Sequence, residues 1–133
     1  IEMLEAVGEE YWPTYFQKLK SLLAERGKAM IQTITIADPL FERYRQSGDV
    51  IRTHIFPGGM LPSPTRFTEE AHKAGLRIAD RFFFGQDYAA TMKSWLKNFD
   101  DKVHAIRALG YDESFIRLWR FYLAACIASF SVE

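Results

Sequence analysis

The sequence predicts an α/β domain in which a mostly parallel sheet is covered by helices. Short β-branched or aromatic segments alternate along the chain with longer segments whose apolar residues recur at helical spacing. The order is strand, helix, strand, helix, strand and then helices, with no internal repeat. This alternation favours right-handed crossovers between parallel strands, and such sheets bind ligands along the edge where the strands end.

Composition indicates one folded domain, or part of a larger one. Of the 133 residues, 48% are apolar and 26% charged, as in ordinary globular chains. The formal net charge is zero, which gives no support for nucleic-acid binding by phosphate attraction. The only cysteine, Cys126, excludes an internal disulfide and fits a reducing cytosol. We expect neither a signal peptide nor a membrane span, because residues 1–10 are acidic and the longest apolar stretch is short.

Two predicted strands flank the first predicted helix. Residues 1–4 (IEML) are apolar and end abruptly in a loop, and residues 28–37 (KAMIQTITIA) are β-branched and read as a buried strand. Between them, residues 11–25 carry an apolar stripe at helical spacing. Pro13 suits the first turn of this helix and Gly27 its C-terminal stop.

The second half of the chain is predicted to be mainly helical. Residues 39–52 suggest a polar helix or loop, and residues 65–75 a short helix that ends at a glycine. Residues 76–84 read as the third strand, and residues 87–109 as a helix stopped by Gly110. A last helix, capped by Ser114, has an apolar stripe made of Phe115, Trp119, Tyr122, Cys126 and Phe130.

Residues 55–64 (IFPGGMLPSP) form an unusual loop. Their prolines and glycines are unsuited to a helix or a strand, yet the segment is apolar where loops are normally polar. One interpretation is that Phe56 fills the core and the two glycines make a tight turn. The other is that the loop forms part of the wall of an apolar binding site.

Three polar side chains are expected at one sheet edge. Glu5 follows the first strand, Gln32 lies in the second, and Tyr88 follows the third. Each also has an ordinary structural interpretation, as a solvated carboxylate, a satisfied core amide and a packing aromatic. No catalytic or phosphate-binding motif is present. The spacing of the histidines predicts no metal site: His54, His72 and His104.

Five segments of the chain resemble one enzyme family. They read IEMLEAVG, YWPTYF, HIFPGGMLPS, FGQDYAATMKSWLKNF and FYLAACIASF, in that order over nearly all of the chain. Together they are similar to the C-terminal half of the cyclopropane-fatty-acyl-phospholipid synthases, a family that includes the mycolic acid cyclopropane synthases. The resemblance implies that residues 1–133 are a partial Rossmann-like class I methyltransferase domain.

The cofactor of this family is S-adenosylmethionine, bound mainly by a glycine-rich loop that the resemblance places upstream of Ile1. The last strand is expected after Glu133, so the chain resembles a fragment that is itself inactive. Here the resemblance implies cofactor contacts only from the backbone of Ile1, Glu2 and Met3.

The family transfers a methyl group to a cis double bond of an unsaturated acyl chain, and the resulting carbocation loses a proton as the ring closes. A bound bicarbonate is thought to be the base. The resemblance assigns bicarbonate contacts to Glu5, the Ile34 amide and Tyr88, together with a cysteine upstream. Gln32 stands where bacterial members have a histidine. A glutamine amide can donate a hydrogen bond to bicarbonate but cannot become a cation or shuttle a proton.

The acyl chain and its cation require a dry, aromatic-rich site, and 15% of the residues are aromatic. The resemblance implies that the substrate-binding wall includes Phe56, Pro57, Gly58, Gly59 and Met60, with Cys126 packed nearby. It further implies unsaturated phospholipid acyl chains at the membrane surface as partners, in a cytoplasmic protein peripheral to the inner membrane. Homodimerisation is left open.

Two alternative functions are compatible with the same motifs. A relative could methylate the acyl chain without cyclising it, giving a branched or methylene product. A non-catalytic lipid-binding paralogue is the other alternative, against which the presence of Glu5 and Tyr88 argues.

Overall fold

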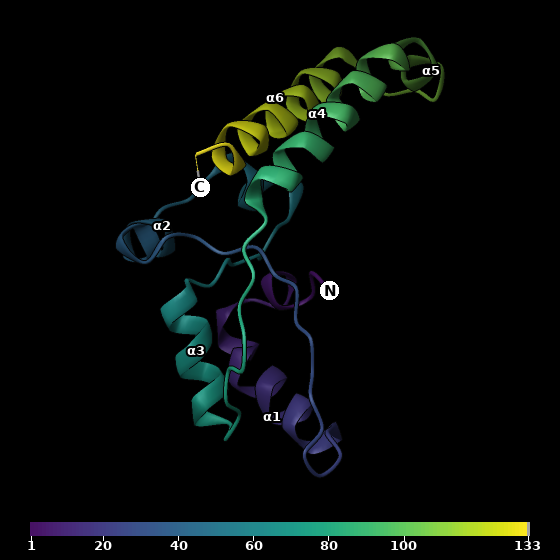
Figure 1. Ribbon diagram of the computed structural model, residues 1–133. Helices are drawn as coiled ribbons and strands as arrows, with labels where there is room; N and C mark the ends of the chain where they lie inside the picture. Colours follow the sequence, from purple (N-terminus) through teal and green to yellow (C-terminus); the bar gives the residue numbers. More distant parts are fainter. Residues whose placement is uncertain (133) are drawn as a thin grey trace. The chain divides into compact units, whose positions relative to one another are not determined.

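The computed structural model describes residues 1–132, which divide into two compact units, residues 1–81 and Phe82 onward (Figure 1). The first unit contains helices α1 (Trp12–Leu22), α2 (Phe41–Gln46) and α3 (Pro64–Lys73). Short helical turns precede these helices: Leu4–Ala6 and Glu9–Tyr11 before α1, Asp38–Leu40 before α2, and the π-helical turn Ile51–Ile55 before α3. The predicted helices at residues 11–25 and 65–75 are therefore confirmed, with ends shifted by a few residues.

The core of the first unit lies between α1 and α3, which run side by side in Figure 1. The Phe16 ring packs edge-to-face against Phe67, with ring centroids 5.1 Å apart. Trp12 is buried, and its indole nitrogen donates a hydrogen bond to the carbonyl oxygen of Leu4. This bond fixes the turn that carries Glu5 to the first turn of α1. The buried apolar cluster comprises Leu4, Trp12, Phe16, Phe41, Met60 and Ala71.

Both ends of α3 follow from its sequence. The Ser63 hydroxyl accepts a hydrogen bond from the backbone nitrogen of Arg66, and Pro64 occupies the first helical position. At the other end Gly75 adopts φ +75°, the left-handed conformation that favours glycine. The nitrogens of Gly75 and Leu76 donate to the carbonyls of His72 and Ala71, which closes the helix.

The second unit is an antiparallel helical pair. Helices α4 (Gly85–Asp101) and α6 (Glu113–Phe130) pack along their length, and α5 (Val103–Ala108) connects them (Figure 1). Gln86 donates to the carbonyl of Ser131 at one end, and Arg120 pairs with Asp100 further along, at 2.6 Å. The buried side chains of this unit are Ala89, Met92, Val103, Ile116 and Leu123.

Two details of the second unit differ from the sequence prediction. The helix expected over residues 87–109 is interrupted at Lys102, whose φ of −107° and ψ of 6° are not helical. The last helix is capped by Asp112 and not by Ser114, because the Asp112 carboxylate accepts from the Phe115 nitrogen at 2.8 Å. Gly110, with φ +94°, is the predicted stop.

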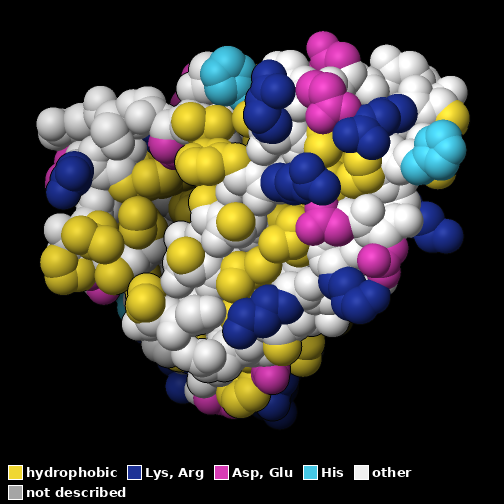
Figure 2. All heavy atoms as spheres, turned by 90° about the horizontal axis from the view of Figure 1, so that it is seen from above, with side chains coloured by type: hydrophobic (Ala, Val, Ile, Leu, Met, Phe, Trp, Pro, Cys, Tyr) yellow, Lys and Arg dark blue, Asp and Glu magenta, His cyan; other side chains and the backbone are white. Residues whose placement is uncertain are grey.

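The predicted parallel sheet is not confirmed. Within residues 1–132 the three expected strand segments are extended or irregular, but none forms a ladder. A strand requires successive backbone hydrogen bonds to a neighbour, whereas residues 1–3 and 28–37 share one, from the Glu2 nitrogen to the Gln32 carbonyl. The second segment is half-buried over residues 31–36 and exposed at its start, where Met30 is 96% exposed. Figure 2 shows such surface apolar side chains interspersed with charged ones.

Candidate functional site

Glu5 lies in the short turn Leu4–Ala6 and is anchored on both sides of its backbone. The Leu4 side chain is buried, and its carbonyl accepts from the Trp12 indole. The carbonyl of Glu5 accepts a hydrogen bond from the Met60 nitrogen at 2.8 Å. The loop of residues 55–64 therefore packs against the backbone of the residue predicted to be catalytic.

The Glu5 carboxylate is held by two neighbouring residues of the second extended segment. The Thr33 hydroxyl donates to Oε2 at 2.8 Å, and the Ile34 backbone nitrogen donates to Oε1 at 3.3 Å. Glu5 and Ile34 were predicted to share a site, and the structure places them in contact. The sequence analysis did not identify Thr33 as a partner of Glu5. The sequence could have indicated it, because Thr33 is the residue between Gln32 and Ile34, which were both predicted to belong to the site.

Gln32 lies beside the first residues of the chain. Its side-chain nitrogen donates to the Glu2 carboxylate at 3.2 Å, and its carbonyl accepts from the Glu2 nitrogen at 2.7 Å. Ile1 and Met3, the other predicted cofactor contacts, are 87% and 56% exposed. Residues 1–5 and 32–34 thus supply two sets of polar contacts that are adjacent along both segments, Gln32 with Glu2 and Thr33–Ile34 with Glu5. We refer to the two sets together as the polar cluster around Glu5.

Tyr15 is a second residue near Glu5 that the sequence did not identify. Burial, and then the negative charge of Glu5, raise the pKa of the Tyr15 phenol above its ordinary value. The sequence assigned Tyr15 to the apolar stripe of the first helix, and its ring does pack edge-to-face on Phe16. Helical periodicity predicts which way a ring faces but not what its hydroxyl approaches.

The glycines of the apolar loop allow a close backbone approach to Glu5. A Cβ at Gly59 would lie 3.1 Å from the Phe56 carbonyl oxygen and 3.4 Å from that of Glu5. Gly58 has φ +83°, a conformation that side chains other than glycine rarely adopt. This close approach is made by the protein's own backbone, and contact of Gly58 and Gly59 with an acyl chain stays a prediction.

The side chains of the loop divide into two groups. Met60 belongs to the buried core, while Phe56 is 55% exposed, with Pro57 and Gly58 also open. Arg52 braces the loop from outside: one guanidinium nitrogen lies 3.1 Å from the Met60 sulfur, and the group sits 4.4 Å from the centre of the Tyr44 ring. The Tyr44 hydroxyl accepts from the Leu61 nitrogen.

Tyr88 and Cys126 lie in the second unit. The Tyr88 ring, in the first turns of α4, packs between Phe84 and Phe130 at centroid distances of 5.7 and 5.0 Å. Cys126 is half-buried in α6, and burial raises the pKa of its thiol to about 11. The meeting of Tyr88 with Glu5 stays a prediction, as does a position of Cys126 near the acyl chain.

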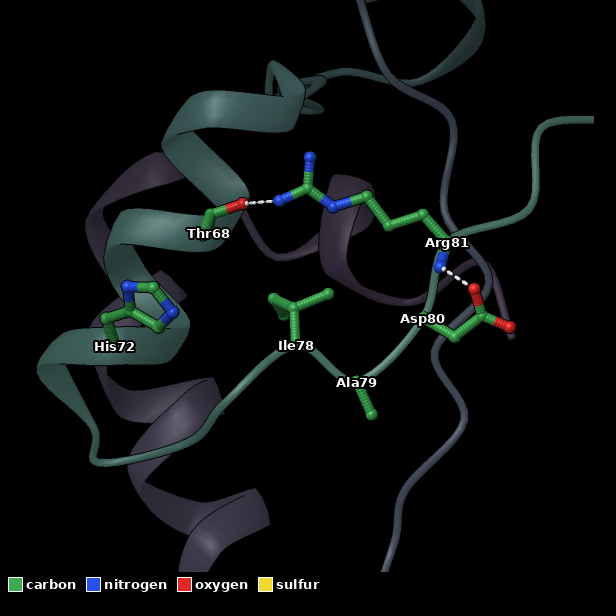
Figure 3. Close-up of a pocket in the computed structure, with 6 residues that line it drawn as sticks. All are labelled: Thr68, His72, Ile78, Ala79, Asp80 and Arg81. Atoms are coloured by element: carbon green, nitrogen blue, oxygen red, sulfur yellow. Dashed lines mark hydrogen bonds between the residues drawn. The ribbon is translucent and has the colours of Figure 1, made fainter.

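A separate open pocket of about 340 Å³ lies on the first unit (Figure 3). Its lining includes Thr68 and His72 of α3 and the segment 78–81, but none of the predicted site residues. Arg81 reaches across to hydrogen-bond the Thr68 hydroxyl, while Asp80 points away from His72, so these two do not form a catalytic pair (Figure 3). The polar cluster around Glu5 is the stronger candidate site.

The described part of the chain contains neither a candidate metal cluster nor a candidate membrane-spanning helix. Residues 1–132 hold no cluster of histidine, cysteine and carboxylate side chains suited to a metal ion. Within the same residues, no helix combines the length and apolarity needed to cross a membrane.

Comparison with known proteins gives a consistent family. The family model described as mycolic acid cyclopropane synthetase matches residues 1–133. A tuberculostearic acid methyltransferase of Mycobacterium tuberculosis is 37% identical over 131 residues, covering 98% of this chain and 31% of that protein. A probable fatty acid methyltransferase of Pseudomonas putida is 33% identical, over 98% of this chain and 33% of the relative. The cyclopropane-fatty-acyl-phospholipid synthase of Escherichia coli is 30% identical, over 98% and 32%.

Solved structures agree on the fold. The cyclopropane synthase MmaA2 of Mycobacterium tuberculosis superposes with a TM-score of 0.86 at 23% identity, over 99% of this chain and 49% of the other. The mycolic acid cyclopropane synthase CmaA1, complexed with SAH and CTAB, superposes with a TM-score of 0.77 at 24% identity and the same coverage. The chain thus has the fold of part of a cyclopropane synthase. It spans about a third of the length of the curated relatives and about half of the solved ones.

Proposed function

Since the chain belongs to the mycolic acid cyclopropane synthetase family, we propose that the whole protein methylates unsaturated acyl chains of phospholipids, with S-adenosylmethionine as methyl donor and a cyclopropane ring as product. S-adenosylmethionine would supply the methyl group, which leaves its sulfonium for one carbon of the double bond. A proton lost from that new methyl group then allows the ring to close.

The observation that carries this proposal is the environment of Glu5. A solvated surface carboxylate needs no fixed partners, whereas this one has a backbone N–H and a hydroxyl donated to its two oxygens. Its own backbone is fixed by the Trp12 indole on one side and by the apolar loop on the other. Such preorganisation is typical of a group that must accept a hydrogen bond at a defined place.

The residues around Glu5 fit a bound bicarbonate. The Ile34 N–H already points at an anionic oxygen, that of Glu5, so it is oriented to donate to an anion. The Gln32 amide is a second donor in the same cluster, now used by the Glu2 carboxylate. Glu5 would accept the bicarbonate hydroxyl hydrogen, and Tyr88 would donate from the second unit. Bicarbonate would supply the base that removes the methyl proton.

The fit to S-adenosylmethionine is limited to the first residues. Ile1 and Met3 are exposed beside the Glu2–Gln32 pair, so their backbone groups are accessible to the methionine end of the cofactor. The glycine-rich motif on which the family's cofactor binding chiefly depends does not occur in this chain.

The acyl chain would lie against the open part of the loop. Phe56 offers an exposed aromatic face, and Pro57 stiffens the segment beside Gly58 and Gly59. Met60 would support this surface without forming its exposed part. Its side chain is buried in the core, and its backbone nitrogen donates to the Glu5 carbonyl. Cys126 would line the same apolar region from α6. We propose a cytoplasmic protein that meets its lipid at the surface of the inner membrane.

A second candidate product is favoured by the relatives. The tuberculostearic acid methyltransferase and the Pseudomonas fatty acid methyltransferase are 37% and 33% identical to the chain, against 30% for the Escherichia cyclopropane synthase. These names support methylation without ring closure, which leaves a methyl-branched or methylene chain. A non-catalytic paralogue is the weakest candidate, since it would have no need of the two donors on Glu5.

Lipid analysis of cells that express the full-length protein tests the proposal. We expect new phospholipid acyl chains that carry label from S-[methyl-¹³C]adenosylmethionine. Proton NMR then separates the shielded ring protons of a cyclopropane from the vinylic protons of a methylene group. Abundant, cofactor-binding protein that leaves every acyl chain unlabelled would contradict the proposal.

A further inference from the structure

The geometry points to Thr33 as a positioning residue, whose hydroxyl holds the Glu5 carboxylate in its working orientation. This inference rests on the proposed function for its consequence in catalysis, but the contact itself is a property of the structure. Thr33 Oγ1 lies 2.8 Å from Glu5 Oε2, the shorter of the two hydrogen bonds to that carboxylate.

The single hydroxyl proton of Thr33 has two acceptors within reach. Glu5 Oε2 is at 2.8 Å, and the Ile34 carbonyl oxygen is at 3.3 Å. The proton goes to Glu5, since hydrogen bonds to an ionised acceptor are shorter and stronger than those to a neutral one. Thr33 therefore acts on Glu5 as a donor.

The backbone next to Thr33 is held by a hydrogen bond to the segment that carries Glu5. The Gln32 carbonyl accepts from the Glu2 nitrogen at 2.7 Å, which fixes the segment one residue before Thr33. Glu2 and Glu5 belong to the same short segment. The donor, Thr33, and its acceptor, Glu5, therefore lie on two segments that a backbone hydrogen bond already joins. This backbone bond lowers the backbone entropy that remains to be lost when the Thr33–Glu5 bond forms.

The Ile34 amide cannot replace this contact during turnover. Its hydrogen bond to Glu5 Oε1 is long, at 3.3 Å, and a backbone nitrogen has only one proton to donate. In the proposed function that proton turns to the bicarbonate. Of the two donors to the Glu5 carboxylate, only the Thr33 hydroxyl then remains. It holds the carboxylate in its orientation while the proton is removed from the new methyl group.

The kinetic test compares three substitutions in the full-length protein. Thr33→Val keeps the shape and removes the hydroxyl, Thr33→Ser keeps the hydroxyl, and Thr14→Val makes the same chemical change at an exposed position of α1. We expect Thr33→Val to lower kcat by roughly 10- to 100-fold, with the KM for lipid within about twofold of the parent. Thr33→Ser should recover most of kcat, and Thr14→Val should equal the parent. A Thr33→Val enzyme as fast as the parent, or a Thr33→Ser enzyme as slow as Thr33→Val, overturns the inference.

A second measurement does not depend on turnover. With glutamate selectively labelled with ¹³C at Cδ, the Glu5 carboxyl resonance, assigned through Glu5→Gln, reports on its bond to Thr33. It should move in Thr33→Val and stay near its parental position in Thr33→Ser and Thr14→Val. An unmoved Glu5 resonance in Thr33→Val would show that Thr33 does not position the carboxylate. If the parent methylates no lipid, the proposed function fails, while this resonance still decides the part of Thr33.

Discussion

At the scale of single residues, the sequence identified the centre of the candidate site but not its supports. Glu5, Gln32 and Ile34 come from two segments, and the structure places them in one cluster. Thr33 and Tyr15 were missed because their types have ordinary explanations, a β-branched residue in an extended segment and an aromatic in a helical stripe. What distinguishes them is their relation to Glu5, a hydrogen bond from the Thr33 hydroxyl and the effect of the Glu5 charge on the pKa of Tyr15, which depends on how distant segments meet.

Cys126 gives a residue-scale prediction that is independent of catalysis. Burial raises the pKa of its thiol from 9.0 to about 11, which leaves less of the reactive thiolate at neutral pH. At about pH 8 we expect the folded protein to react with iodoacetamide roughly 100-fold more slowly at this position than the urea-unfolded protein. The rate should rise with pH until the thiol ionises, near pH 11.

Peptide mass spectrometry resolves the Cys126 peptide from any other thiol, and free cysteine serves as the reference. Equal rates for folded and unfolded protein would contradict a half-buried thiol in α6.

At the scale of elements, most of the helices were predicted correctly, whereas the predicted sheet is not confirmed within residues 1–132. A helix makes its hydrogen bonds within its own segment, so Pro64, Gly75 and Gly110 signal its ends wherever they occur. An extended segment must find its partners elsewhere. Residues 28–37 have the composition of a strand but form one backbone bond with residues 1–3 instead of a ladder.

The cap of α6 differs from the one that the sequence predicted. Ser114 was the expected cap, yet the Asp112 carboxylate is the group that accepts from the Phe115 nitrogen. Asp112→Ala should lower the free energy of unfolding by about 1 kcal/mol, because an N-terminal N–H of the helix loses its acceptor. Ser114→Ala should change it by less than about 0.5 kcal/mol.

Urea unfolding followed by circular dichroism measures both variants against the parent. The assignment of the cap is wrong if Ser114→Ala is the more damaging of the two.

At the scale of the whole molecule, the motifs carried more information than the periodicity. The quoted segments pointed to one family over nearly the entire chain, and the family model matches residues 1–133. The hydrophobic periodicity and the composition alone predict only an α/β domain with an aromatic-rich site. The meeting of Tyr88 with Glu5 depends on the arrangement of the two units, which local sequence patterns do not specify, and it stays a prediction.

We propose that the Glu5 carboxylate, fixed by Thr33 and Ile34, takes part in removing the proton from the methylated acyl chain. The most direct measurement is the turnover number of full-length Glu5→Gln beside that of Glu10→Gln, which makes the same change at an exposed carboxylate of the next turn. We predict a loss of at least about 100-fold for Glu5→Gln, with unchanged thermal unfolding, and parental activity for Glu10→Gln. A folded Glu5→Gln enzyme that turns over as fast as the parent would contradict this role of Glu5.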